Sequence, residues 1–331
     1  MASEEKKPRV ILGLMTFGPP DTEQFGTRMT SLDTFNDCLD LLQRRGYNEV
    51  DTARTYVDGH QEAWTRDAQW QKRALKLATK WYPRQPGDHA AAIVEKQLEK
   101  SLSELGFDSV DIFYLHGPDR SVPFEETLQA VNELYQEGKF KQLGLSNYAA
   151  WEVATICTIA RERKWIQPTI YQAMYNAFTR AIEEELVPCC RNFGLEIVVY
   201  NPLAGGVLSG KYRSSDAPID GRFSDTDPVV GKMYRDRYFR DANFEALQIL
   251  EPVAKEHGLT LPQVALRWCV HHSKLDVVNG SDGIIIGVSS REQLETNLDI
   301  LEQGPLPQAT VDALDQVWEK VTKASCPRYW R

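Results

Sequence analysis

Four ionisable residues stand at the ends of three successive apolar runs in the first half of the sequence. Asp51 and Tyr56 come just after one run. Lys80 closes the next run, and His116 closes the one after that. In parallel β/α architectures the C-terminal tips of neighbouring strands meet at one rim, where the chemistry is carried out. An acid, a phenol, an ammonium and an imidazole gathered there would deliver a proton.

The reduction of a carbonyl group suits this set, because the oxygen must be protonated as a hydride attacks the carbon. Tyr56 would serve as the acid only if its phenol pKa fell from about 10 toward neutrality. An ammonium about 4 Å away, at an effective dielectric of about 20, contributes roughly 4 kcal/mol, or about 3 pK units at most. Lys80 would supply that charge, and Asp51 would hold it in place. His116 would donate to the carbonyl oxygen, and no metal is needed.

Eight strand-like segments alternate with amphipathic patterns that have the spacing of helices. The predicted strands are Val10–Phe17, Tyr47–Asp51, Leu75–Lys80, Val110–His116, Gln142–Asn147, Thr169–Tyr175, Glu196–Asn201 and Gly283–Val288. The predicted helices are Leu32–Gln43, Ala90–Leu105, Glu125–Gln136, Trp151–Arg163, Ile182–Phe193 and Gln293–Leu301. The strands are short apolar runs, as is typical of strands buried on both faces. The alternation predicts an α/β fold, a (β/α)8 TIM barrel.

An open doubly wound sheet is the second interpretation of the same alternation. Its dinucleotide-binding form would carry G-x-G-x-x-G after the first strand, and residues 13–18 lack that spacing. We expect one barrel domain over residues 1–331 with two additions. Residues 203–242 form a long loop after the seventh strand, and residues 303–331 form a tail with one helix over Thr310–Thr322. Long loops on this face of a barrel usually hold ligand.

The bulk composition excludes several classes of function. A net charge of −9 repels phosphate backbones, which argues against nucleic-acid binding. The first eight residues contain no apolar stretch that could act as a signal peptide, and the longest apolar runs are too short to span a bilayer. The six cysteines form no C-x-x-C pair. We interpret them as reduced thiols of a cytoplasmic protein.

Several motifs resemble those of the aldo-keto reductases. The segment from Asp51 to Glu62 reads D-T-A-x-x-Y-x-x-G-x-x-E and is similar to the first signature of that family. The strand ends at Lys80 and His116 resemble those that carry the family's lysine and histidine. The branch of aflatoxin-aldehyde and succinic-semialdehyde reductases is the most similar, through S-N-Y-A-x-W-E-V at 146–153, G-G-x-L-x-G-K-Y at 205–212 and C-P-x-Y-x-R at 326–331.

The resemblance implies an NADPH-dependent oxidoreductase that reduces aldehydes, and some ketones or dialdehydes, to alcohols. Tyr56 would be the proton donor, Lys80 would lower its pKa, Asp51 would hold Lys80, and His116 would orient the carbonyl. The residues implied in cofactor binding fall into two groups. Ser146, Asn147 and Gln172 would bind the nicotinamide carboxamide, with Tyr200 stacked on the ring, and Asn201, Leu203, Gly205 and Lys211 would follow the pyrophosphate.

Ser289, Ser290 and Gln293 open the last predicted helix of the barrel. A serine with glutamine three residues on is a capping box, which is the simpler interpretation. A helix N-terminus with hydroxyl groups is also a phosphate site. In the family this segment, with Asn297, receives the adenosine 2′-phosphate, and Arg222 would add charge. The resemblance therefore favours NADPH over NADH.

The two added segments are rich in arginine although the chain is acidic overall. A solvated run of charges is one interpretation of residues 235–240. The other is a carboxylate pocket, because arginine binds carboxylates through two parallel hydrogen bonds. The resemblance places Tyr234, Arg237 and Arg331 near an acidic aldehyde such as succinic semialdehyde.

The sequence leaves three other functions to compare with aldehyde reduction. The channel β subunits that share this family's fold bind cofactor as regulatory subunits, often behind a long N-terminal extension. A barrel aldolase would use Lys80 as a Schiff base. A P-loop at Gly205–Lys211 would need Ser or Thr next, where Tyr212 stands. We expect a small-molecule aldehyde as partner, no nucleic acid or membrane, and, from the resemblance, a homodimer.

Overall fold

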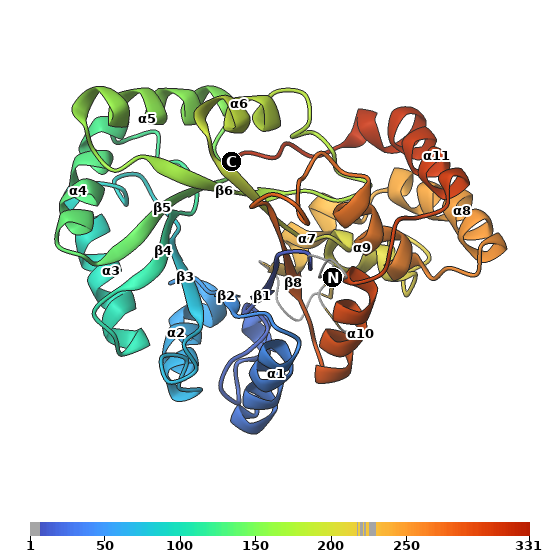
Figure 1. The fold of residues 1–331 in the computed structure, drawn as a ribbon, viewed down its shortest axis with the longest axis horizontal. Coiled ribbons are helices and arrows are strands. Elements are labelled where there is room, and N and C mark those ends of the chain that lie inside the picture. The colour runs from blue at the N-terminus through green and yellow to red at the C-terminus, as the bar shows by residue number, and fades with distance from the viewer. Residues whose placement is uncertain (1–6, 217, 219–220, 222, 225–229) are drawn as a thin grey trace, which may run out of the picture.

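A computed structural model describes residues 7–216, 218, 221, 223–224 and 230–331. Eight parallel strands close into a barrel in sequence order, with helices around it (Figure 1). The strands are β1 (Val10–Gly13), β2 (Glu49–Asp51), β3 (Lys76–Trp81), β4 (Val110–Leu115), β5 (Phe140–Ser146), β6 (Pro168–Met174), β7 (Glu196–Tyr200) and β8 (Gly283–Gly287). The predicted (β/α)8 barrel is confirmed. Apart from β1, which stops at Gly13 rather than Phe17, the strand ends lie close to the predicted ones.

The helices cover the outside of the barrel. They are α1 (Leu32–Arg44), α2 (Gln61–Asp67), α3 (Ala91–Leu105), α4 (Phe124–Gln136), α5 (Ala150–Arg163), α6 (Leu186–Phe193), α7 (Val230–Tyr238), α8 (Asp241–Glu256), α9 (Leu261–His271), α10 (Arg291–Leu301) and α11 (Gln308–Val317). Gly106 and Gly194 end α3 and α6 with φ of 69° and 73°. This left-handed conformation suits glycine because it has no Cβ.

The barrel has an inner core that is separate from the layer between strands and helices. Inward-facing side chains from alternate positions of the strands form this inner cluster, namely Ile11, Ala78, Ile112, Tyr114, Ile170, Val198 and Ile285. Tyr114 fills the centre against Gly144, where a Cβ would lie 2.2 Å from the ring. The interior is therefore packed solid below the rim.

The segment predicted as a loop over residues 203–242 is partly helical, which corrects the sequence analysis. It contains the 3₁₀ helix η3 (Ala204–Ser209) and the helix α7. Tyr234 and Tyr238 of α7 pack onto Gly205, where a Cβ would lie 2.8 Å and 3.0 Å from their rings. This tertiary contact stabilises α7, whose sequence is otherwise mostly polar. The helices α2, α8 and α9 were also not predicted.

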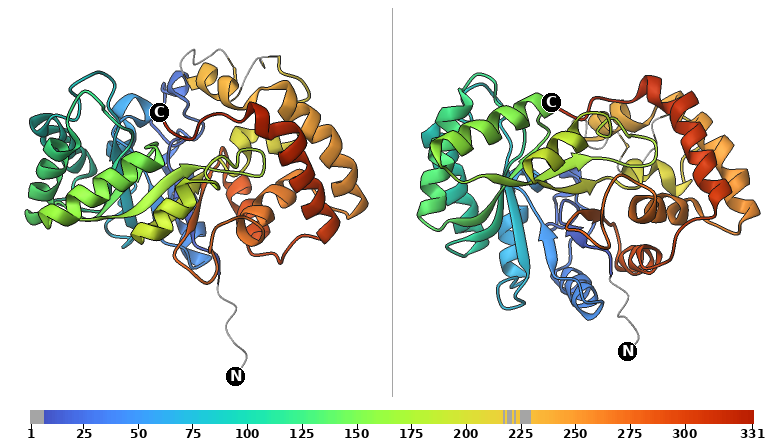
Figure 2. Two further views of the ribbon diagram at one scale, coloured as in Figure 1. Left: turned by 90° about the horizontal axis from the view of Figure 1, so that it is seen from above. Right: turned by 45° about the horizontal axis from the view of Figure 1, so that its top comes forward.

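The tail leaves α11 through a π-helical turn, η4 (Trp318–Thr322), and runs back over the barrel toward β6 (Figures 1 and 2). The predicted helix over residues 310–322 thus corresponds to α11 with this turn. The hydroxyl of Tyr329 donates to Glu185 at 2.5 Å and accepts the N–H of Ala150 at 3.1 Å. The N–H of Arg331 donates to the carbonyl of Asn147 at 3.0 Å. The tail is therefore anchored on the rim.

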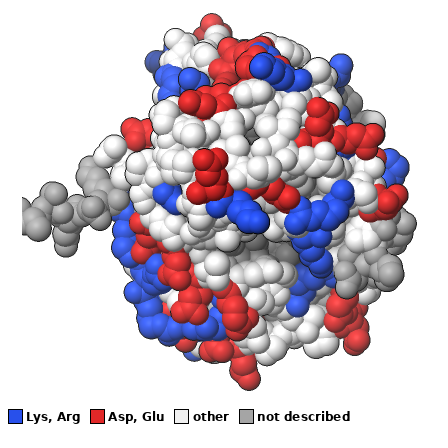
Figure 3. Space-filling view, turned by 90° about the vertical axis from the view of Figure 1, so that its right-hand side faces the viewer, with Lys and Arg blue, Asp and Glu red and all other residues white. Residues whose placement is uncertain are grey.

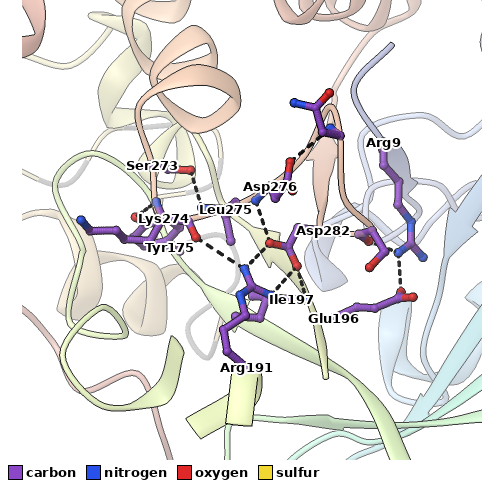
Figure 4. Close-up of polar contacts among 12 residues, drawn as sticks. Arg9, Tyr175, Arg191, Glu196, Ile197, Ser273, Lys274, Leu275, Asp276 and Asp282 are labelled. Carbon is purple, nitrogen blue, oxygen red and sulfur yellow. Dashed lines mark hydrogen bonds and ion pairs between the residues drawn. The ribbon is translucent and has the colours of Figure 1, made fainter. Parts of the chain in front are cut away.

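A network of charged groups lies away from that rim, where β7 and β8 begin (Figure 4). Asp282 is buried and accepts the N–H groups of Ile197 at 2.7 Å and Asp276 at 2.8 Å, together with the guanidinium of Arg191. Its carboxylate therefore joins the segment before β8 to the start of β7 and to α6. This network holds the strands in register without touching the rim.

The outer surface carries charges of both signs. Lys, Arg, Asp and Glu side chains are interspersed over the face that carries α8 and α11 (Figure 3). Among the described residues, no helix has the length and apolar character needed to cross a membrane. All six cysteines are free.

Candidate active site

Lys80 and Asp51 form a buried ion pair at the rim of the barrel. Their strands β2 and β3 are adjacent and parallel, with Asp51 opposite Ala78 in register. Lys80 has no exposed surface, and its Nζ donates to Oδ1 of Asp51 at 2.5 Å and to the carbonyl of Thr52 at 2.6 Å. Burial lowers the pKa of Lys80, and the carboxylate of Asp51 opposes that shift. The pair therefore keeps an ammonium in a site that water does not reach.

Both oxygens of Asp51 are occupied. Gln172 of β6 donates its amide to Oδ2 at 2.9 Å and is itself hydrogen-bonded to the hydroxyl of Tyr114. The Asp51 carboxylate is thus fixed from across the barrel. The structure therefore gives Gln172 a bracing contact to Asp51, and its expected contact with a nicotinamide stays a prediction.

Tyr56 lies over Lys80. It opens the 3₁₀ helix η2 (Tyr56–Gly59), which follows β2, and its ring centre lies 4.8 Å from Nζ of Lys80. The same ring meets His116 edge-on, with centres 6.0 Å apart and planes at 76°. The four residues singled out in the sequence are therefore neighbours in the fold.

His116 directly follows β4 and carries a neutral ring at pH 7. Burial, together with the positive charges of Lys80 and Arg237, lowers its pKa well below the ordinary value for histidine. Its Nδ1 is buried and has no hydrogen-bond partner within the described part of the chain. A neutral imidazole has one N–H to donate and one nitrogen to accept. It can therefore bind a carbonyl oxygen without protonating it.

Three residues predicted to hold the nicotinamide form one hydrogen-bonded chain beside His116. The hydroxyl of Tyr200 donates to Oδ1 of Asn147 at 3.0 Å. The amide of Asn147 donates to the carbonyl of His116 at 2.7 Å and to the hydroxyl of Ser146 at 3.0 Å. Asn147 takes the left-handed conformation, with φ of 63°. The ends of β5 and β7 are thus linked to His116 at the rim.

The predicted pyrophosphate residues lie in the turn after β7. Asn201, Ala204, Gly205 and Gly206 have φ of 58°, 50°, 67° and 114°. A backbone with such residues can turn several N–H groups toward one side, as in anion-binding nests. A Cβ on Gly206 would be in ordinary contact, at 3.8 Å, with the rings of Phe223 and Tyr212. The turn therefore fits a bound diphosphate, with Leu203 at its start and Lys211 just beyond it.

The N-terminus of α10 has the capping arrangement expected from the sequence. The hydroxyl of Ser290 accepts the N–H of Gln293 at 3.2 Å. Oε1 of Gln293 in turn accepts the N–H of Ser289 at 2.9 Å and its hydroxyl at 2.8 Å. Asn297 is buried on the same helix one turn later. Arg222, which was expected to add charge here, lies outside the described residues.

Of the predicted substrate residues, Arg237 and Arg331 line one cavity, and Tyr234 lies beside Arg237, whose guanidinium is 5.9 Å from the centre of its ring. A cavity of about 680 Å³ opens between α7 and the tail. The residues that line it are Lys232, Met233, Asp236, Arg237, Arg240, Pro327, Arg328, Trp330 and Arg331. Arg237 is only 9% exposed, and its Nε has no hydrogen-bond partner in the part of the chain described here. Tyr234 does not line this cavity and packs against the turn after β7 instead.

Sequence reasoning missed three residues beside the site. Tyr82 stands two positions after Lys80, and its ring meets His116 edge-on with centres 5.4 Å apart. Its place just beyond a strand tip was the signal that could have found it. Tyr114 was missed because its contact with Gln172 joins segments far apart in the sequence. Arg54 was missed because its partner, Glu62, lies on the next helix.

The chain is similar to known proteins over almost its whole length. The family model described as Aldo/keto reductase family matches residues 9–319. Aflatoxin B1 aldehyde reductase member 2 of Homo sapiens is 46% identical, over 99% of this chain and 92% of that protein. Aflatoxin B1 aldehyde reductase member 2 of Mus musculus is 43% identical, over 98% and 88%. Aldo-keto reductase family 7 member A3 of Homo sapiens is 42% identical, over 98% of each chain.

The buried pair gives a stability test. Asp51→Asn leaves the Lys80 ammonium buried without its counter-charge, so we expect a loss of about 3–5 kcal/mol in the free energy of unfolding. Asp51→Asn combined with Lys80→Met removes both charges and should recover a large part of that loss. Urea unfolding followed by circular dichroism measures both. A double variant no more stable than Asp51→Asn alone would show that Lys80 is not charged in the folded protein.

Proposed function

Since the chain belongs to the aldo/keto reductase family and is an oxidoreductase that reduces aldehydes, we propose that it uses NADPH and that Tyr56 donates the proton. The observation that carries this proposal is the buried ammonium of Lys80 beneath the ring of Tyr56, 4.8 Å from its centre. A fixed positive charge next to a phenol favours the phenolate and so makes the phenol a stronger acid. With Tyr56 as the acid, the reaction needs no other proton donor.

When bound, the cofactor would supply the hydride for the carbonyl carbon of the aldehyde. Tyr56 transfers its phenolic proton to the carbonyl oxygen as that oxygen gains charge. Lys80 stabilises the phenolate that remains, and Asp51, braced by Gln172, keeps the ammonium charged and in place. Because the site is buried, these charges act through a medium of low dielectric, where they are worth more than in water.

His116 has a separate role in this proposal. Its neutral ring donates an N–H to the carbonyl oxygen and so fixes the direction in which the aldehyde presents its carbon. The lowered pKa of His116 supports this, because an imidazolium would compete with Tyr56 as the acid. Tyr82, edge-on to the same ring, would form the wall on the other side of the aldehyde.

The cofactor would lie across the ends of β5 to β8. Ser146 and Asn147 would hold the carboxamide, with Tyr200 stacked on the nicotinamide ring. The turn from Asn201 to Gly205, with Leu203 and Lys211, would bind the diphosphate. The support is the left-handed backbone of this turn and the hydrogen-bonded chain that links Tyr200 to the rim. Gln172 would bind the carboxamide while its own amide still donates to Asp51.

The preference for NADPH rests on the start of α10. A 2′-phosphate would be bound by Ser289, Ser290 and Gln293, with Asn297 one turn later on α10. The positive end of the helix dipole favours a phosphate there. Arg222 would add charge from the loop after β7.

We propose an acidic aldehyde such as succinic semialdehyde as substrate. Arg237 supports this choice, because a buried guanidinium with an unpartnered Nε is ready to bind a carboxylate. The positive charge of Arg237 also contributes to lowering the pKa of His116, which supports a carboxylate site on the same side of the barrel as His116. Arg331 lines the same cavity, and the ring of Tyr234 would support the Arg237 guanidinium, which lies 5.9 Å from its centre. Some ketones and dialdehydes would fit the same site.

The resemblance to the aldehyde reductases further leads us to propose a homodimer in the cytoplasm. Six free cysteines suit a reducing compartment.

The reaction is tested by following NADPH consumption at 340 nm with a panel of aldehydes. We expect the purified protein to oxidise NADPH and to have a lower KM for NADPH than for NADH. Tyr56→Phe keeps the ring over Lys80 and removes only the hydroxyl, so kcat should fall by about 10²–10⁴-fold. The dissociation constant for NADPH, measured by quenching of tryptophan fluorescence, should stay within about twofold.

Two results would count against this proposal. If Tyr56→Phe turned over at the wild-type rate, the proton would come from another group. A KM for NADH equal to or below that for NADPH would remove the role given to the start of α10.

The carboxylate site is tested with two substrates of different charge. Arg237→Ala should raise KM for succinic semialdehyde by about 10–100-fold, since a charge-assisted hydrogen bond contributes about 1.5–3 kcal/mol. KM for 4-nitrobenzaldehyde should be almost unchanged. Lys232→Ala is the matched control, because Lys232 lines the same cavity but is exposed and paired with Asp236 at 2.6 Å. Equal losses with both substrates would contradict the site.

A further inference from the structure

The loop that carries Tyr56 has an unfavourable backbone. The two residues after Tyr56, Val57 and Asp58, have φ of 51° and 48°, and Gly59 follows with φ of 89°. Three successive left-handed residues, of which two have side chains, do not hold this conformation by themselves. The surrounding contacts must impose it.

A buried ion pair closes this loop. The guanidinium of Arg54 donates to Oε2 of Glu62 with Nη1 and to the carbonyl of Gly59 with Nη2. Glu62 lies on α2 and has no exposed surface, and the Arg54 side chain is 11% exposed. The residues on either side of Tyr56 are therefore held together by one side-chain bridge, with Tyr56 at the apex between them.

The same bridge is attached to the strand that carries Lys80. The hydroxyl of Thr79 donates to Oε1 of Glu62 at 2.6 Å, and Thr79 is the residue next to Lys80 on β3. The backbone N–H of Arg54 donates to the carbonyl of Lys80 at 2.9 Å. Nζ of Lys80 donates to the carbonyl of Thr52, at the start of the loop. Both partners of the bridge thus contact β3 beside the ammonium.

The approach of Arg54 to the loop also requires glycine at position 59. A Cβ there would lie 2.6 Å from Nη2 of Arg54. Stability alone does not explain the buried Arg54–Glu62 pair. A buried ion pair often stabilises a protein no more than apolar side chains of the same size would. A role in fixing the position of the loop that carries Tyr56 would explain why Arg54 and Glu62 are charged.

We propose that the Arg54–Glu62 pair is a positioning device, which sets the place of the Tyr56 phenol relative to the Lys80 ammonium. This inference rests on the proposed function, in which the phenol is the proton donor. The attraction between an ammonium and a phenolate weakens by about a fifth when their distance grows from about 4 Å to about 5 Å. A misplacement of about 1 Å in a catalytic group costs roughly 10²-fold in rate. The negative charge of Glu62 also favours the charged form of Lys80.

The test replaces the pair without leaving a lone charge. Arg54→Met combined with Glu62→Leu removes both charges and keeps the volume, so the barrel should fold. We expect the single-turnover rate of NADPH oxidation, measured by stopped flow with saturating aldehyde, to fall by about 30–100-fold. KM for the aldehyde and the dissociation constant for NADPH should stay within about twofold, because neither residue touches their sites.

Asp282→Asn is the matched control for a purely structural effect. Asp282 is a buried carboxylate paired with Arg191 (Figure 4), and it directly precedes β8, at the end of the strand opposite to the rim. It should lower the melting temperature by several degrees and leave the single-turnover rate unchanged. A milder variant, Thr79→Val, removes only one hydrogen bond to Glu62 and should slow the same step by about 3–10-fold. Thr79→Val tests the positioning role if the double variant does not fold.

The outcomes separate the inference from the proposed function. A folded double variant, or Thr79→Val in its place, that turns over at the wild-type rate overturns the positioning role alone. So does a loss that appears equally in Asp282→Asn. A wild-type protein that reduces no aldehyde with NADPH overturns the proposed function itself.

Discussion

The structure depends on keeping one full positive charge at the dry rim of the barrel. Lys80 has no exposed surface, so every contact that water would make must come from the chain. Asp51 supplies the counter-charge and Thr52 a carbonyl, while Gln172 fixes the second oxygen of the carboxylate. Burial alone would favour the neutral amine, and the position of Asp51 restores the ammonium. The proton donor is proposed to draw its acidity from this charge.

The charged groups that stabilise the barrel lie in a different region from those that hold the Lys80 ammonium. Away from the rim, Arg9 binds Glu49 and Glu196 and so ties together the strands β1, β2 and β7. Asp282 does the same for the start of β7 and the segment before β8. The packed interior around Tyr114 lies between the two regions. We therefore expect substitutions at Arg9 or Asp282 to affect stability, and substitutions at the rim to affect the reaction.

Much of the fold could be predicted because the strands are short apolar runs at regular spacing. The places of Asp51, Tyr56, Lys80 and His116 followed from their positions at or just after strand ends, and the family signature agreed with them. What the sequence could not give depends on contacts between distant segments. Helix α7 is stabilised by packing onto the turn after β7, and its own sequence is mostly polar. The contact of Gln172 with Asp51 joins β6 to β2, and no local pattern indicates it.

The central claim is most directly tested by a crystal structure of the protein with NADP⁺ bound. We expect the hydroxyl of Tyr56 to lie within hydrogen-bond distance of Nζ of Lys80, about 3 Å, and to face C4 of the nicotinamide. A hydroxyl turned away from the ammonium, or a nicotinamide ring whose C4 lies on the far side of the rim, would contradict it.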